Sequence, residues 1–226
     1  MKHALFWSGG KDSLLALDRA TRSGLEVSHL VNVAEGNTHR VRFHGVRKEL
    51  IQAQADALGK TLLQIETHPE SFEQAFARAL AQARSLGIEA IAFGNIHLAD
   101  VRAWYEERTT GAGLRHVEPI WGEPPGALVR EFVARGHLSR IVSVYPQAGG
   151  KREWLGRDIT TDFIEAVERA GADPAGECGE YHSFAYGGPL FRDALRIRVA
   201  GEFEREGHRI LDLIGIPDPG VTSEIP

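Results

Sequence analysis

Short apolar runs alternate along the chain with segments that have the spacing of an amphipathic helix. Runs at residues 27–33, 62–65 and 90–93 are each followed by a helical pattern, at residues 46–58, 72–86 and 99–108. Such alternation is typical of a parallel sheet covered by helices. Within 72–86, apolar residues recur three and four positions apart and Gly87 follows as a stop, so we expect a buried face made of Phe72, Ala75, Phe76, Ala79, Leu80, Ala83 and Leu86.

The same rhythm continues on both sides of this region. An apolar run at residues 3–7 precedes two glycines and a helical pattern at 13–20. Two less clear units follow later, with runs at 117–121 and 141–144 that lead to helical patterns at 127–135 and 159–170. Apolar runs at 195–199 and 210–214 predict a terminal hairpin. We expect regular structure to end at Pro217, Pro219 and Gly220.

The segment between the first strand pattern and the first helix pattern consists of Ser8, Gly9, Gly10, Lys11, Asp12 and Ser13. Two glycines let the backbone approach an anion closely, and the free N–H groups at a helix start point toward negative charge. Lys11 adds a positive charge, and the two serines add hydroxyl donors. Phosphates would repel Asp12 unless a cation lay between them, so this loop implies a bound magnesium ion. The Walker A spacing does not fit, because the residue after the lysine is acidic.

Ligands of parallel α/β sheets bind at the carboxyl ends of the strands, so residues that follow each strand are candidates. Asn32 and Val33 end the second strand pattern, where their backbone could contact an adenine edge. Gly94 and Asn95 follow a later strand, at a point where a side chain would hinder close approach. His44 precedes a helix and could face the nucleotide, although a surface or capping role is the commoner use of such a histidine.

A second polar segment, residues 173–184, combines two carboxylates with a histidine among small residues. Gly176 and Gly179 permit a tight backbone. Glu177 and Glu180 could bind an ammonium, a quaternary amine or a metal while His182 moves a proton. A polar turn that leads into a strand is the alternative interpretation, and the residue types alone do not decide between them.

Composition indicates a soluble enzyme of one large domain, or one domain with a small lobe: the chain has 226 residues, 42% hydrophobic and 25% charged. No run approaches the roughly 18 apolar residues of a membrane span, and a phosphate loop at residue 8 leaves no room for a signal peptide, so we expect a cytoplasmic location and no membrane contact. The single cysteine, Cys178, excludes an intrachain disulfide and a cysteine-rich zinc site, and we interpret it as a packing residue.

The formal net charge of −5 argues against a broad nucleic-acid surface. A local group of basic residues is interpreted as a solvated helix start; it comprises Arg40, Arg42, Arg47 and Lys48.

The loop Ser-Gly-Gly-x-Asp-Ser resembles the PP-loop of the ATP pyrophosphatases, which split ATP between its α and β phosphates. Further segments occur in the order found in one family, namely residues 44–47, 94–96, 119–122 and 176–184. The chain is therefore similar to the diphthine–ammonia ligase family. The resemblance implies an adenine-nucleotide α-hydrolase sheet in a Rossmann-like α/β domain, with residues 1–123 binding ATP and a smaller α+β portion, residues 124–226, binding the substrate.

The same resemblance implies the reaction. ATP would adenylate a carboxylate, in this family that of diphthine on elongation factor 2, and ammonia would then displace AMP. Ser8, Gly9, Gly10, Lys11 and Ser13 would hold the phosphates and Asp12 the magnesium ion, while substrate contacts would come from Glu177, Gly179, Glu180, Tyr181 and His182. Lys11, Asp12, Glu180 and His182 would be the catalytic set. The family usually has aspartate at the position of Asn95, cysteine at Ala175 and threonine at Ser183.

Other functions remain open on the sequence. A transfer-RNA thiolase or a lysidine-type synthetase shares the PP-loop, although the missing cysteine pair and the acidic balance speak against both. A nucleotide sensor that binds ATP without cleaving it uses a similar sheet. Ammonia is expected from solution or a partner, since a lone cysteine offers no convincing glutaminase nucleophile. The acceptor could be another small molecule or an RNA, and a homodimer stays open.

Overall fold

The computed structural model describes residues 1–67 and 72–216. In its first half the predicted alternation of strands and helices is confirmed. The elements are β1 (Lys2–Phe6), α1 (Lys11–Arg22), β2 (Glu26–Glu35), β3 (Arg40–Val41), α2 (Lys48–Ala57), β4 (Thr61–Thr67), α3 (Phe72–Ser85), β5 (Ala90–Ala92), α4 (Ala99–Gly111) and β6 (Arg115–Val117).

Five of these strands form a parallel sheet in the order β4-β2-β1-β5-β6, and β3 pairs antiparallel with the end of β2. The chain moves outward from β1 to β2 and β4, and then crosses back to β5 and β6 on the other side of β1. A ligand in such a sheet binds beside this reversal, at the carboxyl ends of β1 and β5. The predicted α/β fold class with a Rossmann-like parallel sheet is confirmed.

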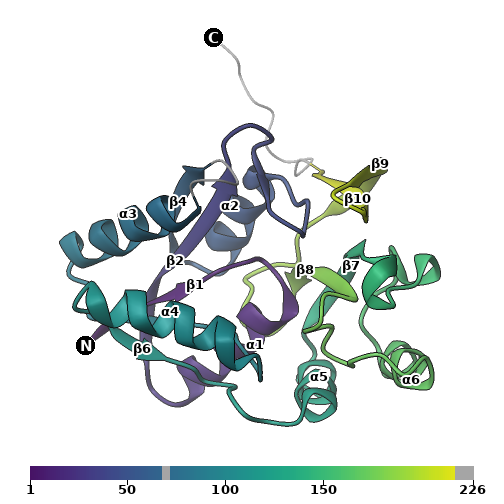
Figure 1. The fold of residues 1–226 in the computed structure, drawn as a ribbon, viewed down its shortest axis with the longest axis horizontal. Coiled ribbons are helices and arrows are strands. Elements are labelled where there is room, and N and C mark those ends of the chain that lie inside the picture. The colour runs from purple at the N-terminus through teal and green to yellow at the C-terminus, as the bar shows by residue number, and fades with distance from the viewer. Residues whose placement is uncertain (68–71, 217–226) are drawn as a thin grey trace.

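Helices cover both faces of the parallel sheet. α3 and α4 pack on one face, and α1 and α2 pack on the other, which also meets the C-terminal part of the chain. Strand side chains alternate between the faces, so Ala4 lies in one core and Leu5 in the other. Phe76 is fully buried, as predicted, whereas Leu86 is 46% exposed because α3 has already ended. Figure 1 shows α3 and α4 on the side away from the second sheet.

The C-terminal part forms a second, antiparallel sheet. Its elements are α5 (Pro125–Ala134), β7 (Leu138–Val144), α6 (Thr161–Arg169), β8 (Tyr181–Gly187), β9 (Ile197–Arg205) and β10 (His208–Gly215), with two short 3₁₀ turns at Pro146–Ala148 and Arg152–Trp154. The strand order is β8-β7-β10-β9. This is the smaller α+β portion that the sequence predicts.

Two expectations for this region were wrong. The apolar run at 141–144 does not extend the parallel sheet, because β7 pairs antiparallel with β8 and β10. Residues 118–121 are not a strand either, since β6 ends at Val117 and a turn follows. A run of apolar residues predicts a strand, but it does not determine which other strand pairs with it through backbone hydrogen bonds.

The terminal hairpin is confirmed, with longer strands than predicted. β9 and β10 are joined at Glu206 and Gly207, both with positive φ, and the charged residues before this turn belong to β9. The predicted end of regular structure at Pro217, Pro219 and Gly220 lies outside the described residues. The two sheets share one continuous hydrophobic core, which runs from α1 to β7, β8 and α6. Across residues 1–67 and 72–216, no helix has the length and apolar character needed to cross a membrane.

Candidate active site

The Ser8–Ser13 loop leaves the carboxyl end of β1 and enters the first turn of α1. Gly9 has a φ of +83°, a conformation that side chains other than glycine rarely adopt. The Ser13 hydroxyl lies 2.8 Å from the Ser8 hydroxyl and accepts the Ser8 backbone N–H at 3.2 Å, while the Ser8 hydroxyl accepts the Gly10 N–H at 3.3 Å. These contacts fold the loop back on the helix start, where the helix dipole favours an anion.

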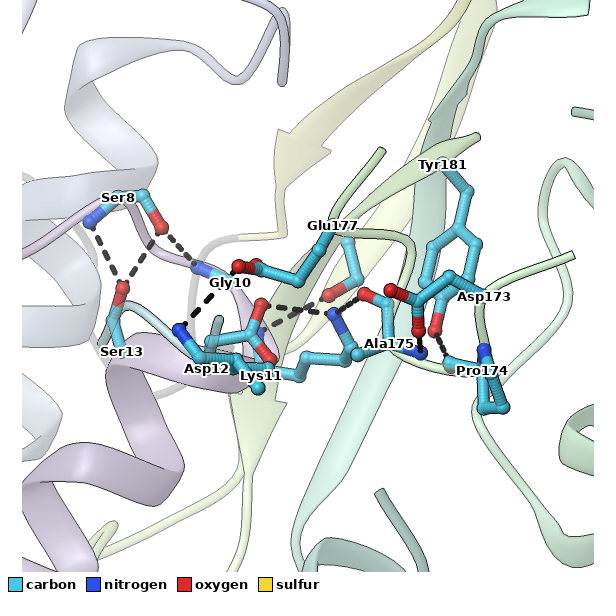
Figure 2. Close-up of polar contacts among 12 residues, drawn as sticks. Ser8, Gly10, Lys11, Asp12, Ser13, Asp173, Pro174, Ala175, Glu177 and Tyr181 are labelled. Atoms are coloured by element: carbon cyan, nitrogen blue, oxygen red, sulfur yellow. Dashed lines mark hydrogen bonds and ion pairs between the residues drawn. The ribbon is translucent and has the colours of Figure 1, made fainter. Parts of the chain in front are cut away.

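Lys11 joins this loop to the second polar segment. Its side chain runs from α1 to the 173–181 loop, where the ammonium donates to the Ala175 carbonyl oxygen and to Asp12 Oδ2, the latter at 2.8 Å (Figure 2). The ammonium also lies 5.0 Å from the centre of the Tyr181 ring. Burial alone would lower the pKa of Lys11, but Asp12, Tyr181 and Glu177 outweigh it and hold that pKa above its ordinary value. Lys11 is therefore a buried cation at neutral pH.

A cavity of about 270 Å³ lies in front of the loop. Predicted site residues from four separate segments line it, namely Ser8, Gly10, Lys11, Asp12, Ser13, His44, Gly94, Asn95, Glu177, Tyr181 and His182. A second cavity of about 290 Å³ adjoins it and contains Asn32 and Val33. The two cavities share the walls formed by Phe6, Ser8, His44, Tyr105 and His182. The structure thus brings most of the predicted residues into one cleft.

Gly94 lets β5 approach the loop. A Cβ atom at this position would lie 2.9 Å from the backbone carbonyl of Asp12 and 3.0 Å from the Ser13 nitrogen, closer than normal contact. The adjacent Asn95 donates from Nδ2 to Glu118 Oε1 at 2.7 Å. Glu118 is buried and also contacts His116, so the Asn95 amide is held in a fixed orientation at the cavity wall.

Glu177 and Asp12 provide two carboxylates to the cavity. Burial, and then the negative charge of Asp12, raise the pKa of Glu177 to about 7. The Ile96 backbone N–H contacts Glu177 Oε2 at 3.4 Å and links the 173–181 loop to the segment that follows β5. A carboxyl group with this pKa can take up or release a proton near neutral pH.

Two neutral histidines separate the cavities. The His44 ring lies 4.8 Å from the His182 ring, and His44 Nδ1 is 3.0 Å from the Ser183 carbonyl oxygen, so Nδ1 carries the proton and Nε2 is left as an acceptor. Burial lowers the pKa of His44 to about 4, and burial with the neighbouring His44 and His208 lowers the pKa of His182. Both rings are therefore hydrogen-bonding groups rather than cations at pH 7.

Three predicted site residues do not line the cavities: Gly9, Gly179 and Glu180. The Gly9 carbonyl turns into the protein, where it accepts the Ala185 N–H at 2.8 Å. Glu180 is 4% exposed, and its Oε1 accepts the Asp173 N–H at 2.9 Å. Glu180 Oε1 is thus bound within its own loop, and the contact of Glu180 with substrate stays a prediction. Cys178 is exposed rather than packed, unlike the prediction.

Sequence reasoning missed several residues of the cleft. Phe93 and Tyr105 come from the parallel-sheet domain, whereas Ser183 on β8 accepts the Lys11 backbone N–H at 3.1 Å. Gln54 on α2 is not part of the cleft wall but is fully buried behind the loop. For Gln54 the sequence did contain a signal, since this amide lies four residues after Leu50 on the apolar face of the helix.

The basic residues near α2 each lie close to a carboxylate. Arg40 and Arg47 both contact Asp212 of β10, at 2.9 and 2.7 Å, and Lys48 pairs with Glu66. Arg42 lies 3.9 Å from Glu35. In the part of the chain that the structure describes, no group of three or more His, Cys, Asp or Glu side chains could hold a metal ion by itself.

Comparison with known proteins agrees with this architecture. A parallel sheet with this loop between its first strand and first helix defines a PP-loop nucleotide-binding protein. The model of the diphthamide synthase N-terminal domain matches residues 1–116, and that of the diphthamide synthase C-terminal domain matches residues 124–216. The chain belongs to the diphthamide synthase family and is an ATP-utilising enzyme of that family, as the sequence resemblance implied.

Other comparisons add little. No curated protein matches the chain. Among solved structures, a predicted subunit of tRNA methyltransferase from Methanocaldococcus jannaschii is similar with a TM-score of 0.44 and 14% identity, over 84% of this chain and 98% of that one. The tRNA thiolase NcsA from Methanococcus maripaludis has a TM-score of 0.37 and 17% identity, over 59% of this chain and 55% of that one. Both scores are too low for any inference about function.

Proposed function

We propose that this protein is an amide ligase that activates a carboxylate with ATP and then amidates it with ammonia, releasing pyrophosphate and AMP. The acceptor is a diphthine-like carboxylate in a protein, as in the family. The observation that carries the proposal is one cleft in which the Ser8–Ser13 loop faces Glu177 and His182 of the C-terminal part. Residues 1–123 supply the nucleotide side and residues 124–226 the acceptor side.

The nucleotide occupies both cavities in this proposal. The adenine lies in the second cavity, beside Asn32 and Val33, and the triphosphate lies against the loop. An acceptor carboxylate oxygen attacks the α phosphorus, the bond from that phosphorus to the bridging oxygen breaks, and pyrophosphate leaves. Backbone N–H groups at the helix start, with Ser8 and Ser13, stabilise the charge that develops on the leaving group.

The described residues fit a magnesium ion that is held mainly by phosphates. Magnesium in such sites keeps several waters and uses one or two protein carboxylates, and Asp12 lies at the cavity wall with a partly exposed carboxylate. When bound, the metal neutralises phosphate charge. Asp12 would hold it. Burial raises the pKa of Asp12, and the Lys11 ammonium opposes this rise and orients the carboxylate from the side of the protein.

The second step takes place on the acceptor side. Ammonia attacks the carbonyl carbon of the acyl adenylate, the carbon–oxygen bond to AMP breaks, and the nitrogen loses a proton. Glu177, with a pKa of about 7, and neutral His182 are placed to accept that proton. Glu180 and Tyr181 act indirectly, because Glu180 binds the Asp173 N–H and the Tyr181 hydroxyl donates to the Pro174 carbonyl at 2.5 Å.

The direct test measures AMP and pyrophosphate from magnesium-ATP and ammonium, with and without elongation factor 2 that bears diphthine. Factor-dependent AMP in stoichiometric amount with new amide supports the proposal. AMP formation with another carboxylate or with RNA only would reject the acceptor. ATP binding without AMP from any acceptor would reject the ligase chemistry in favour of a sensor.

Matched variants separate the roles. Lys11→Ala should lower kcat about 100-fold if the buried cation that orients Asp12 contributes as much as one preorganised donor, about 3 kcal/mol. Glu180→Gln with His182→Ala should abolish amide formation while ATP still binds. Cys178→Ser is the control, since Cys178 is exposed and lies outside the cavity lining. Full activity in the double variant would refute the acceptor-side roles.

A further inference from the structure

Gln54 lies directly behind the phosphate loop and uses both ends of its amide. Its side chain is 0% exposed. Gln54 Oε1 accepts the Trp7 indole N–H at 2.7 Å, and Nε2 donates to the carbonyl oxygens of Gly9 at 2.9 Å and Ala185 at 2.5 Å. These three partners belong to the end of β1, to the loop and to β8. One buried amide on α2 thus joins the segment at residues 7–9 to β8, which lies far away in the sequence.

The Gly9 carbonyl is the critical partner. A loop that binds phosphates must present N–H groups to them, and a carbonyl oxygen directed at the same site would repel the negative charge. Here the Gly9 oxygen is turned into the protein, where Gln54 and the Ala185 N–H, at 2.8 Å, both donate to it. A Cβ on Gly9 would lie 2.9 Å from Gln54 Oε1 and 2.7 Å from Ile51, so this side of the loop is tightly packed.

We propose that Gln54 is a positioning residue for triphosphate binding, which it serves by holding the Gly9 carbonyl away from the phosphates and by fixing the loop to β8. The inference rests on the proposed function only in that the loop binds the phosphates of ATP. Gln54 lines neither cavity, and within the described part of the chain Trp7 is the one residue of the second cavity with which its side chain forms a hydrogen bond. Its loss should therefore weaken binding of the phosphate chain and leave binding of the nucleoside almost unchanged.

Two substitutions test the donors. In Gln54→Glu the side chain keeps its size and can still accept the Trp7 N–H, but it offers no N–H to Gly9 or Ala185 and places negative charge beside two carbonyl oxygens. Gln54→Met keeps the volume and removes the hydrogen bonds without adding charge. Gln52→Glu is the matched control on the same helix, because Gln52 is exposed and its side chain donates to Asp56, outside both cavities.

The experiment is calorimetric titration of each full-length variant with a non-hydrolysable ATP analogue and, separately, with adenosine, in magnesium buffer. Thermal unfolding of the free variants shows that they are folded. We expect the Kd for the analogue to rise about 10- to 100-fold in Gln54→Glu and Gln54→Met, as for a displacement of about 1 Å in a preorganised site. The Kd for adenosine should stay within about twofold, and Gln52→Glu should match the wild type with both ligands.

Three results would overturn the inference. Unchanged analogue affinity in both Gln54 variants would show that the loop holds its conformation without the amide. An equal loss for analogue and adenosine would show a general structural role instead. If wild-type protein bound the ATP analogue no more tightly than adenosine, the phosphate site of the proposed function would fail together with this inference. If the phosphates increased the affinity of the wild type and of both Gln54 variants equally, only the role of Gln54 would be rejected.

Discussion

Replacing Gly94 by alanine is expected to displace the phosphate loop without removing a catalytic side chain. Gly94 follows β5 and lies directly against the first turn of α1. The added methyl would lie 2.9 Å from the carbonyl carbon and oxygen of Asp12 and 3.0 Å from the Ser13 nitrogen. Because these are backbone atoms, they cannot rotate away as a flexible side chain would.

The size of the effect follows from this geometry. Ordinary contact between such atoms requires about 3.5 Å, so β5 and the start of α1 must separate by roughly 0.5 Å. Overpacking of this kind costs about 1 to 3 kcal/mol of folding free energy, and for a chain of this length each kcal/mol lowers Tm by roughly 2 to 4 °C. Since the phosphate donors move with α1, ATP affinity should fall about 10- to 100-fold.

Thermal unfolding and titration with a non-hydrolysable ATP analogue measure both quantities. Gly111→Ala is the control, because Gly111 lies at the end of α4 with nothing within 4 Å of the added Cβ and with no positive φ. This control should bind ATP normally and be equally or slightly more stable. Wild-type stability and ATP affinity in Gly94→Ala would refute the argument that this glycine sets the distance between β5 and the loop.

Two further predictions concern the charges around the cleft. Asn95→Asp would set a carboxylate against Glu118, whose Oε1 lies 2.7 Å from the present amide nitrogen, and should lower the free energy of unfolding in urea by about 2 kcal/mol. Adding Glu118→Gln should restore the lost stability, and equal stability of the single and the double variant would contradict this prediction. Arg47 and Arg40 lower the pKa of Asp212 to about 2, below its ordinary value of 3.8. The ionised group therefore stabilises the fold above about pH 4, and this contribution is lost as the pH falls toward 2. Asp212→Asn should be about 2 kcal/mol less stable at pH 7 and match the wild type near pH 2; a difference in unfolding free energy that is constant with pH would exclude the pairing.

The sequence predicted the nucleotide side of the site better than the acceptor side. The Ser8–Ser13 loop, Gly94 and Asn95 all line the cleft, because strand ends in a parallel sheet meet at one edge whatever the side chains are. No such rule determines which side chains of the 173–184 segment face the cleft. This segment contains two glutamates, and only the backbone path decides that Glu177 faces the cavity while Glu180 turns into its own loop.

Local patterns by themselves determined the alternation of strands and helices, the phosphate loop between β1 and α1, and the family, because each depends on residues that are neighbours in sequence. Only the tertiary structure shows that β7 belongs to the antiparallel sheet and that Gln54 and Ser183 form hydrogen bonds with the loop. It also shows the ion pairs of Asp212, in the terminal hairpin, with Arg40 and Arg47. The bonds from Lys11 to Ser183 and from Gln54 to Ala185 span 172 and 131 residues. A sequence pattern carries information over a few turns of a helix or along one strand, whereas such contacts are selected by the packing of the whole core, which is why they become visible only in the folded chain.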